Sequence, residues 1–87
     1  MSPERAEILG LEALAWLAAD PDGLARFQSQ SGVDAADLRT AAGSPELGAA
    51  IIDFLLLHED LLIAFCEASE TEPAQLHRAR RLLLPEA

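Results

Sequence analysis

The sequence predicts an all-α fold, a single domain over residues 1–87 that forms a compact bundle of about six short helices. Ala and Leu, both strong helix formers, account for 17 and 16 of the 87 residues. β-branched residues are scarce and Tyr is absent, so a sheet built from this chain would pack poorly. About half of the residues are apolar, which argues against a disordered chain.

An internal repeat, at residues 3–43 and 45–84, predicts that the helices form two pseudo-symmetric three-helix halves. A shift of 38 residues aligns 8 identical residues among the 26 positions from 17 to 42. Ser-Pro-Glu also occurs at residues 2–4 and 44–46, an offset of 42 that makes the first helix about one turn longer. Chance similarity between two Ala- and Leu-rich stretches is the alternative explanation. The identities pair Leu17, Asp22, Leu24, Phe27, Ser31, Ala36, Leu38 and Ala41 with Leu55, Asp60, Leu62, Phe65, Ser69, Ala74, Leu76 and Ala79.

The first half begins with a helix predicted over about residues 3–19. Ser2 caps its free backbone N–H groups, and Pro3 at the first position has no N–H to leave unpaired. The helix stops before Asp20-Pro21, because the residue before a proline avoids the helical region.

The second helix is predicted over about residues 21–30. Asp20 caps its start, and Gly32 ends it in the left-handed conformation that glycine adopts without strain. The third helix is predicted over about residues 35–42 by the same reasoning. Asp34 caps its start, and Gly43 ends it.

The second half repeats this order, with helices over about 45–57, 59–69 and 73–83. No proline forces a break at His58, and the apolar residues on both sides of it would also share one face of a continuous helix. The analogy with Asp20 in the first half favours a break or kink at this residue.

The helical period also predicts which side chains form the core. Residues Phe54 to Leu57 sweep all the way round a helix, so that helix is either central in the fold or covered by another chain. The expected core residues are Leu9, Trp16, Leu17, Leu24, Phe27, Val33, Leu38, Ile51, Phe54, Leu55, Leu62, Phe65, Leu76 and Leu83.

The charge balance narrows the class of partner. The chain has 15 carboxylates against 6 basic groups, all Arg, and its net charge of −9 repels nucleic acids and anionic lipids while favouring basic partners. Four polar groups interrupt the most apolar stretch, Leu47 to Cys66, which argues against a membrane span. We find no signal peptide at the start, and the single Cys66 fits a reducing compartment, so we expect a cytoplasmic protein.

Polar clusters offer little chemistry. Residues 58–60, His-Glu-Asp, form the densest cluster, but with Cys66 and His77 they fit no compact zinc motif. A nucleophilic role for Cys66 would need a lowered pKa, whereas its neighbours Glu67 and Glu70 would raise that pKa. We therefore predict no metal, no cofactor and no catalytic residue, and expect that the chain is not an enzyme.

Seven residues are candidates for an interaction site. Asp53 lies in an apolar run, where it is a functional carboxylate, or lies at the solvated edge of the helix, or pairs with an Arg. The arginines late in the last helix either bind a phosphate or an acidic segment, or simply complement the negative end of that helix and pair with the surplus carboxylates. The candidates are Leu56, Leu57, Asp53, His58, Arg78, Arg80 and Arg81.

Turn and core residues along nearly the whole chain form one pattern. It comprises Leu-Ala-Ala-Asp-Pro at 17–21, Leu24, Phe27, Gly32, residues 34–38, Asp-Phe-Leu-Leu at 53–56, Leu-Leu-Ile-Ala-Phe at 61–65 and residues 73–76.

This pattern resembles the Domain of Unknown Function 3572 family, short bacterial proteins found mainly in alphaproteobacteria. The chain departs from that family at Glu70-Thr71-Glu72, where members commonly have Gly before the last capped helix. The resemblance implies an all-helical domain and carries over no catalytic residues.

The leading hypothesis is a non-catalytic module that binds an unknown protein partner or forms a homodimer, because the chain combines an all-round apolar segment with a lack of chemistry. The alternative is a binder of a small anionic ligand in a groove between the two helical halves. Enzymatic activity is the weakest of the three hypotheses.

Overall fold

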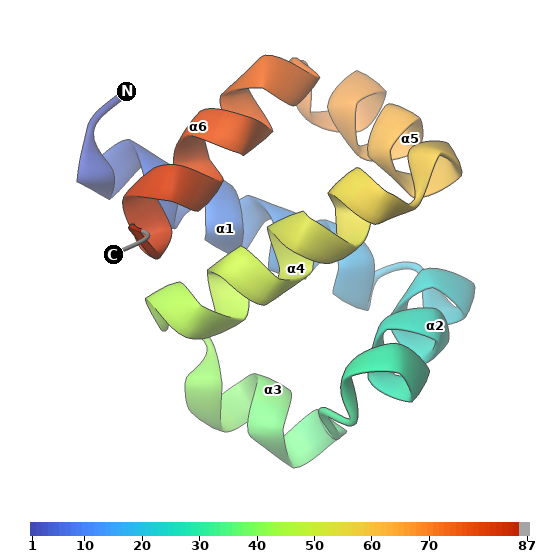
Figure 1. The fold of residues 1–87 in the computed structure, drawn as a ribbon. Helices are drawn as coiled ribbons and strands as arrows, with labels where there is room; N and C mark the ends of the chain where they lie inside the picture. Colours follow the sequence, from blue (N-terminus) through green and yellow to red (C-terminus); the bar gives the residue numbers. More distant parts are fainter. Residues whose placement is uncertain (86–87) are drawn as a thin grey trace.

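Six helices make up the fold that the computed structural model shows for residues 1–85 (Figure 1). Within these residues no strand occurs, so the predicted all-α class is confirmed. All six predicted helices are present, and each ends within one residue of the predicted position. They are α1 (Pro3–Ala18), α2 (Pro21–Ser31), α3 (Ala35–Ala41), α4 (Pro45–Leu57), α5 (Glu59–Ser69) and α6 (Pro73–Leu83).

Side-chain caps explain three of the six helix starts. The Ser2 hydroxyl accepts a hydrogen bond from the Arg5 backbone N–H at 3.1 Å, and Ser44 caps α4 in the same way. Asp34 forms a capping box with Asp37 at the start of α3. The prediction that Asp20 caps α2 is wrong, because its side chain accepts no helix N–H. Asp20 still occupies the N-cap position, with ψ of 98° against 158° at Ser2, and its backbone carbonyl accepts from the Leu24 N–H at 2.8 Å.

The predicted break at His58 is confirmed. His58 has φ −120° and ψ 91°, close to the φ −113° and ψ 98° of Asp20, which stands 38 residues earlier. Its N–H donates to the Leu55 carbonyl, and its own carbonyl accepts from Leu62. α4 and α5 are therefore separate helices that meet at a sharp joint.

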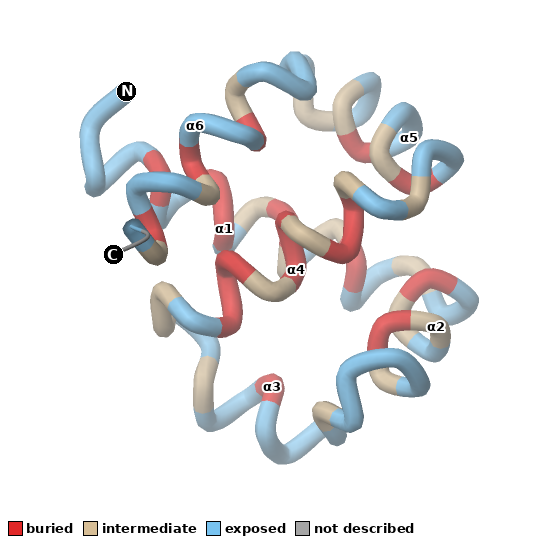
Figure 2. Tube along the Cα trace, viewed as in Figure 1, coloured by how far each residue is buried: buried red, intermediate tan, exposed pale blue. Residues whose placement is uncertain are grey.

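The two longest helices, α1 and α4, cross at the centre of the molecule, and α6 packs against both of them (Figure 1). Their buried residues gather where they meet (Figure 2). Gly10 and Gly48 lie at the crossing, where a Cβ added to Gly10 would stand only 3.3 Å from the Gly48 Cα atom. The two helix backbones approach this closely because neither residue has a side chain.

The central position of α4 explains why apolar residues from Phe54 to Leu57 lie on every side of this helix. α1, α5 and α6 pack around α4, and Phe54 and Leu55 are buried in the core. Leu56 is part-buried against the same core. Leu57 is the exception, since 79% of it is exposed.

Most of the predicted core is confirmed, in ten of its fourteen residues. Trp16, Leu24, Val33 and Leu62 differ, because they pack against the core from its edge and solvent reaches one side of each. The prediction also missed several buried residues, mainly alanines, which carry little weight in a hydrophobic pattern. Those missed are Ala6, Ala13, Leu47, Ala49, Ile52, Leu61 and Ala79.

The offset of 38 residues recurs in the local geometry. Gly32 and Glu70, which end α2 and α5, both have left-handed backbones, with φ of 76° and 55°. Ser31 and Ser69 each donate a hydrogen bond of 2.7 Å to the backbone carbonyl four residues earlier. Gly10 and Gly48 are also 38 residues apart. These matches support the predicted repeat, which stays a prediction, because α6 packs on both central helices whereas α3 contacts the others only sparsely.

We expect the substitution Gly10→Leu to lower the free energy of unfolding by about 2 kcal/mol or more, because its side chain has no room against α4. In a domain of this size each 1 kcal/mol lowers Tm by about 4–8 °C, which thermal unfolding followed by circular dichroism measures. Ala18→Leu, at an exposed position of the same helix, is the matched control. Equal stability of the two variants would contradict the close helix contact.

We expect Glu70→Gly to raise the free energy of unfolding by about 1 kcal/mol, because a left-handed backbone strains any residue that carries a Cβ. The opposite change, Gly32→Ala, tests the same conformation at the end of α2. A Cβ there meets nothing within 4 Å, so its cost is the backbone strain alone. Urea denaturation of both variants should show shifts of opposite sign, and shifts of the same sign would refute this explanation.

Candidate functional site

An open groove of about 270 Å³ lies between α2 and α4. The rings of Phe27 and Phe54 form its floor and meet edge to face, with their centroids 5.3 Å apart. Leu57, the last residue of α4, stands at its edge. We call this the α2/α4 groove, and its lining residues are Phe27, Gln30, Ser31, Ala50, Asp53, Phe54 and Leu57.

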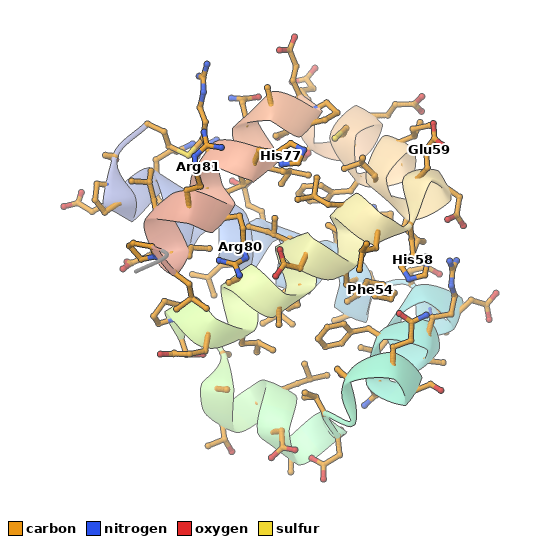
Figure 3. All side chains as sticks on the ribbon, viewed as in Figure 1. Phe54, His58, Glu59, His77, Arg80 and Arg81 are labelled. Atoms are coloured by element: carbon orange, nitrogen blue, oxygen red, sulfur yellow. The ribbon has the colours of Figure 1, made fainter. Side chains whose placement is uncertain are left out.

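Among the candidates from the sequence, the structure brings Asp53 and Leu57 together in this groove. His58 follows Leu57 directly, and its ring lies 4.6 Å from the Phe54 ring (Figure 3). Leu56 does not line the groove and is part-buried against the core instead. The groove therefore contains the most exposed apolar side chain of the predicted set.

A polar network holds α2 against the joint between α4 and α5. Arg26 donates one hydrogen bond to His58 Nδ1, at 3.0 Å, and another to Asp60, at 2.9 Å. A guanidinium group can only donate, so Nδ1 accepts in this contact and Nε2 is the nitrogen that donates. That nitrogen donates to Gln30 Oε1 at 2.9 Å.

Sequence reasoning missed Arg26 and Gln30, because their partners lie about thirty residues away along the chain. The only signal was that Arg26 is a lone cation in an acidic stretch. Its hydrogen bond to Asp60 lowers the pKa of that carboxyl below its ordinary value and raises the pKa of Arg26.

Asp53 and Arg80 form an ion pair that ties α4 to α6. Arg80 Nε lies 2.8 Å from both oxygens of the Asp53 carboxylate, and its Nη1 donates to the Leu84 carbonyl. Figure 3 shows Arg80 directed toward α4. The structure therefore favours the ion-pair explanation of Asp53, and it removes Arg80 from the predicted patch of free arginines.

The other two arginines of α6, Arg78 and Arg81, are exposed. In the part of the chain that the structure describes, neither forms an ion pair. With Met1 and Leu82 they line an open hollow of about 280 Å³. This Arg78/Arg81 patch is separate from the α2/α4 groove, so the seven predicted residues do not form one site.

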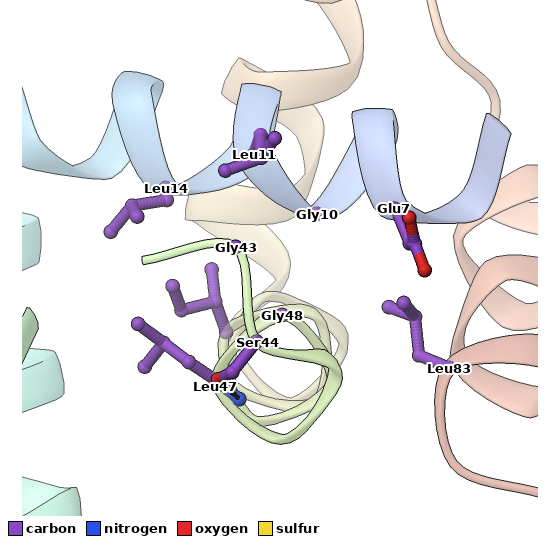
Figure 4. A pocket seen from close by; sticks show the side chains of 10 residues that line it. Glu7, Gly10, Leu11, Leu14, Gly43, Ser44, Leu47, Gly48 and Leu83 are labelled. Atoms are coloured by element: carbon purple, nitrogen blue, oxygen red, sulfur yellow. Dashed lines mark hydrogen bonds between the residues drawn. The ribbon is translucent and has the colours of Figure 1, made fainter. Parts of the chain in front are cut away.

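The space between the two central helices is nearly closed. At the crossing of Gly10 and Gly48 the cavity measures about 10 Å³, and Leu83 of α6 also lines it (Figure 4). Such a volume holds at most one water molecule. The paired glycines bring the helices into contact, so the predicted ligand groove between the two halves does not lie at this crossing. The α2/α4 groove does lie between the halves, because α2 belongs to the first and α4 to the second.

Cys66 is part-buried, and burial raises the pKa of its thiol. Among residues 1–85 no histidine forms a hydrogen bond with it. The same residues contain no group of three or more His, Cys, Asp or Glu side chains placed to hold a metal ion. None of their helices has the length and apolar character needed to cross a membrane.

We expect Arg26→Gln to raise the pKa of Asp60 toward its ordinary value, because the variant removes the hydrogen bond that stabilises the carboxylate. Carboxyl ¹³C shifts followed by NMR against pH measure this pKa. The pKa of Asp60 is lower in the folded state than in the unfolded chain, where it is about 4. The pair therefore stabilises the fold fully at pH values above the unfolded-state pKa, and this stabilisation is lost as the pH falls through the folded-state pKa. Arg39→Gln is the control, and an Asp60 pKa that moves equally in both variants would contradict the pairing.

Comparison with known protein families gives a match. The family described as Protein of unknown function (DUF3572) matches residues 3–86, nearly the whole chain. No curated protein and no solved structure matches this chain. The resemblance predicted from the turn and core residues is confirmed, and the chain belongs to the DUF3572 family.

Proposed function

We propose that this chain is a non-catalytic, cytoplasmic protein-binding module that docks an apolar segment of a partner in the α2/α4 groove. The observation that carries the proposal is Leu57, which is 79% exposed beside a groove floored by Phe27 and Phe54. Burying a leucine side chain completely gains about 1.5–3 kcal/mol, so a partner that covers Leu57 recovers free energy that the isolated chain forgoes. A single part-buried cysteine suits a reducing compartment.

The groove is well held, which lowers the entropic cost of binding. On the α2 side, Gln30 Oε1 accepts a hydrogen bond from His58 Nε2 at 2.9 Å, which ties α2 to the end of α4. On the α4 side, the His58 ring lies against Phe54 and is itself fixed by Arg26. Both walls are thus positioned before a partner arrives.

The surroundings of the groove indicate the chemistry of the partner. The floor is aromatic, whereas Asp53 and Gln30 place polar groups in its lining, and the whole chain has a net charge of −9. An amphipathic helix with leucine-like side chains on one face and basic residues on the other would complement this surface. A stable interface commonly covers about 800 Å² of each partner, which is a substantial share of the 5123 Å² that this chain exposes. A partner that covers so large an area also contacts parts of α2 and α4 beside the groove.

We expect Leu57→Lys to abolish partner binding while it leaves the fold intact, because it removes an exposed apolar contact and places a cation opposite basic residues. Ile63→Lys is the matched control, since Ile63 is 49% exposed on α5 and does not line the groove. The tagged wild type and both variants are recovered from native cells, and bound proteins are quantified by mass spectrometry.

A partner that is lost only with Leu57→Lys supports the proposal, and an untagged copy of this chain recovered with the same specificity would identify the partner as a second copy. Equal recovery with all three chains, or no partner with any of them, would contradict the proposal. Thermal unfolding of each variant verifies that its fold is preserved.

A further inference from the structure

A second groove, of about 400 Å³, lies between α1 and α5. Its lining residues are Glu12, Ala15, Trp16, Phe65, Ala68 and Ser69. The internal repeat relates each of these residues to one that is 38 positions away. Adding 38 to the first three residue numbers gives 50, 53 and 54, and subtracting 38 from the last three gives 27, 30 and 31. All six of these line the α2/α4 groove, in which Leu57 alone has no counterpart.

The floors of the two grooves are built alike. In the α1/α5 groove the rings of Trp16 and Phe65 meet edge to face, with centroids 5.7 Å apart and an interplanar angle of 67°. Phe27 and Phe54 meet at 5.3 Å and 74°. Each groove therefore presents an aromatic floor between one central helix and one outer helix.

Each groove also has one carboxylate from its central helix. Glu12 lies 3.7 Å from Arg5, and Asp53 lies 2.8 Å from Arg80. Asp53 corresponds to residue 15 in the first half, which is three residues after Glu12 and so on the same side of the helix. The two carboxylates thus take similar places beside similar apolar floors.

We propose that the two grooves bind two copies of the same class of segment, an amphipathic helix with leucine-like side chains and basic flanks. The proposal rests on the proposed function and extends it from one docking site to two. The shared aromatic floors favour the same occupant in both grooves. Because both carboxylates are already paired with arginines, it is the net charge of −9 that favours the basic flanks. The chain then bridges two partner molecules, or holds two segments of one partner with a raised effective concentration.

The α1/α5 groove binds more weakly, because Ala19 stands where the α2/α4 groove has Leu57. Replacing a fully buried leucine contact by a much smaller one reduces affinity about tenfold. Two sites of unequal affinity are therefore expected.

The chain contains a natural reporter for one of the two sites. Trp16 is its single tryptophan and lines the α1/α5 groove but not the α2/α4 groove. Tryptophan fluorescence therefore reports binding at the weaker site, whereas calorimetry reports the total.

The probe is an amphipathic helical peptide with leucine on one face and lysine on the other, and the control peptide has glutamine in place of leucine. We expect calorimetry to give about two peptides per chain, with no comparable binding of the control peptide. Leu57→Lys should remove the tighter site and leave the fluorescence change, and Ala15→Lys should remove the fluorescence change and leave the tighter site. Ala15 is exposed, so its substitution does not disturb the core.

A stoichiometry of one that Leu57→Lys abolishes, with silent fluorescence, overturns the second site and leaves the proposed function standing. Binding that Leu57→Lys does not alter overturns the proposed function. Equal binding of both peptides, or of neither, overturns the amphipathic occupant itself.

Discussion

The fold depends on the close contact of α1 and α4 at Gly10 and Gly48. Helices approach this closely only where side chains are absent, and the chain places a glycine on each side of the contact. Leu83 of α6 packs onto the same crossing, so the third central helix is positioned by the first two. α2 and α5 then lie on the outside, and each forms a groove with the neighbouring central helix.

Polar contacts in this protein mainly position elements that the apolar core already holds. Arg80 joins α6 to α4 through Asp53, and Arg26 joins α2 to the joint at His58. These pairs are partly or largely exposed, and such pairs add little stability. Their effect is geometric, because Arg80 ties α6 to α4 and Arg26 ties α2 to the joint that follows α4.

The helices could be predicted because their ends carry local signals. Ser2, Ser44 and Gly32 mark boundaries through their own side chain or backbone, and the structure places the boundaries there. Groove walls and ion pairs could not be predicted, because they join residues that the folded chain brings together from distant positions. Leu57 is informative in this respect, since its exposure follows from where α5 turns away and not from its neighbours in sequence. The glycines of the central contact were missed for a related reason, because a glycine inside a helix shows its purpose only when its partner is known.

The packing of α1 has a consequence for synthesis on the ribosome. Its main packing partners are α4 and α6, which belong to the second half of the chain, so most of the apolar face of α1 is covered only after most of the chain has been made. The first half that emerges therefore exposes the apolar face of its longest helix to the cell. Folding of this protein is expected to be completed after translation rather than progressively during it, and until then α1 is the segment in greatest need of protection from aggregation.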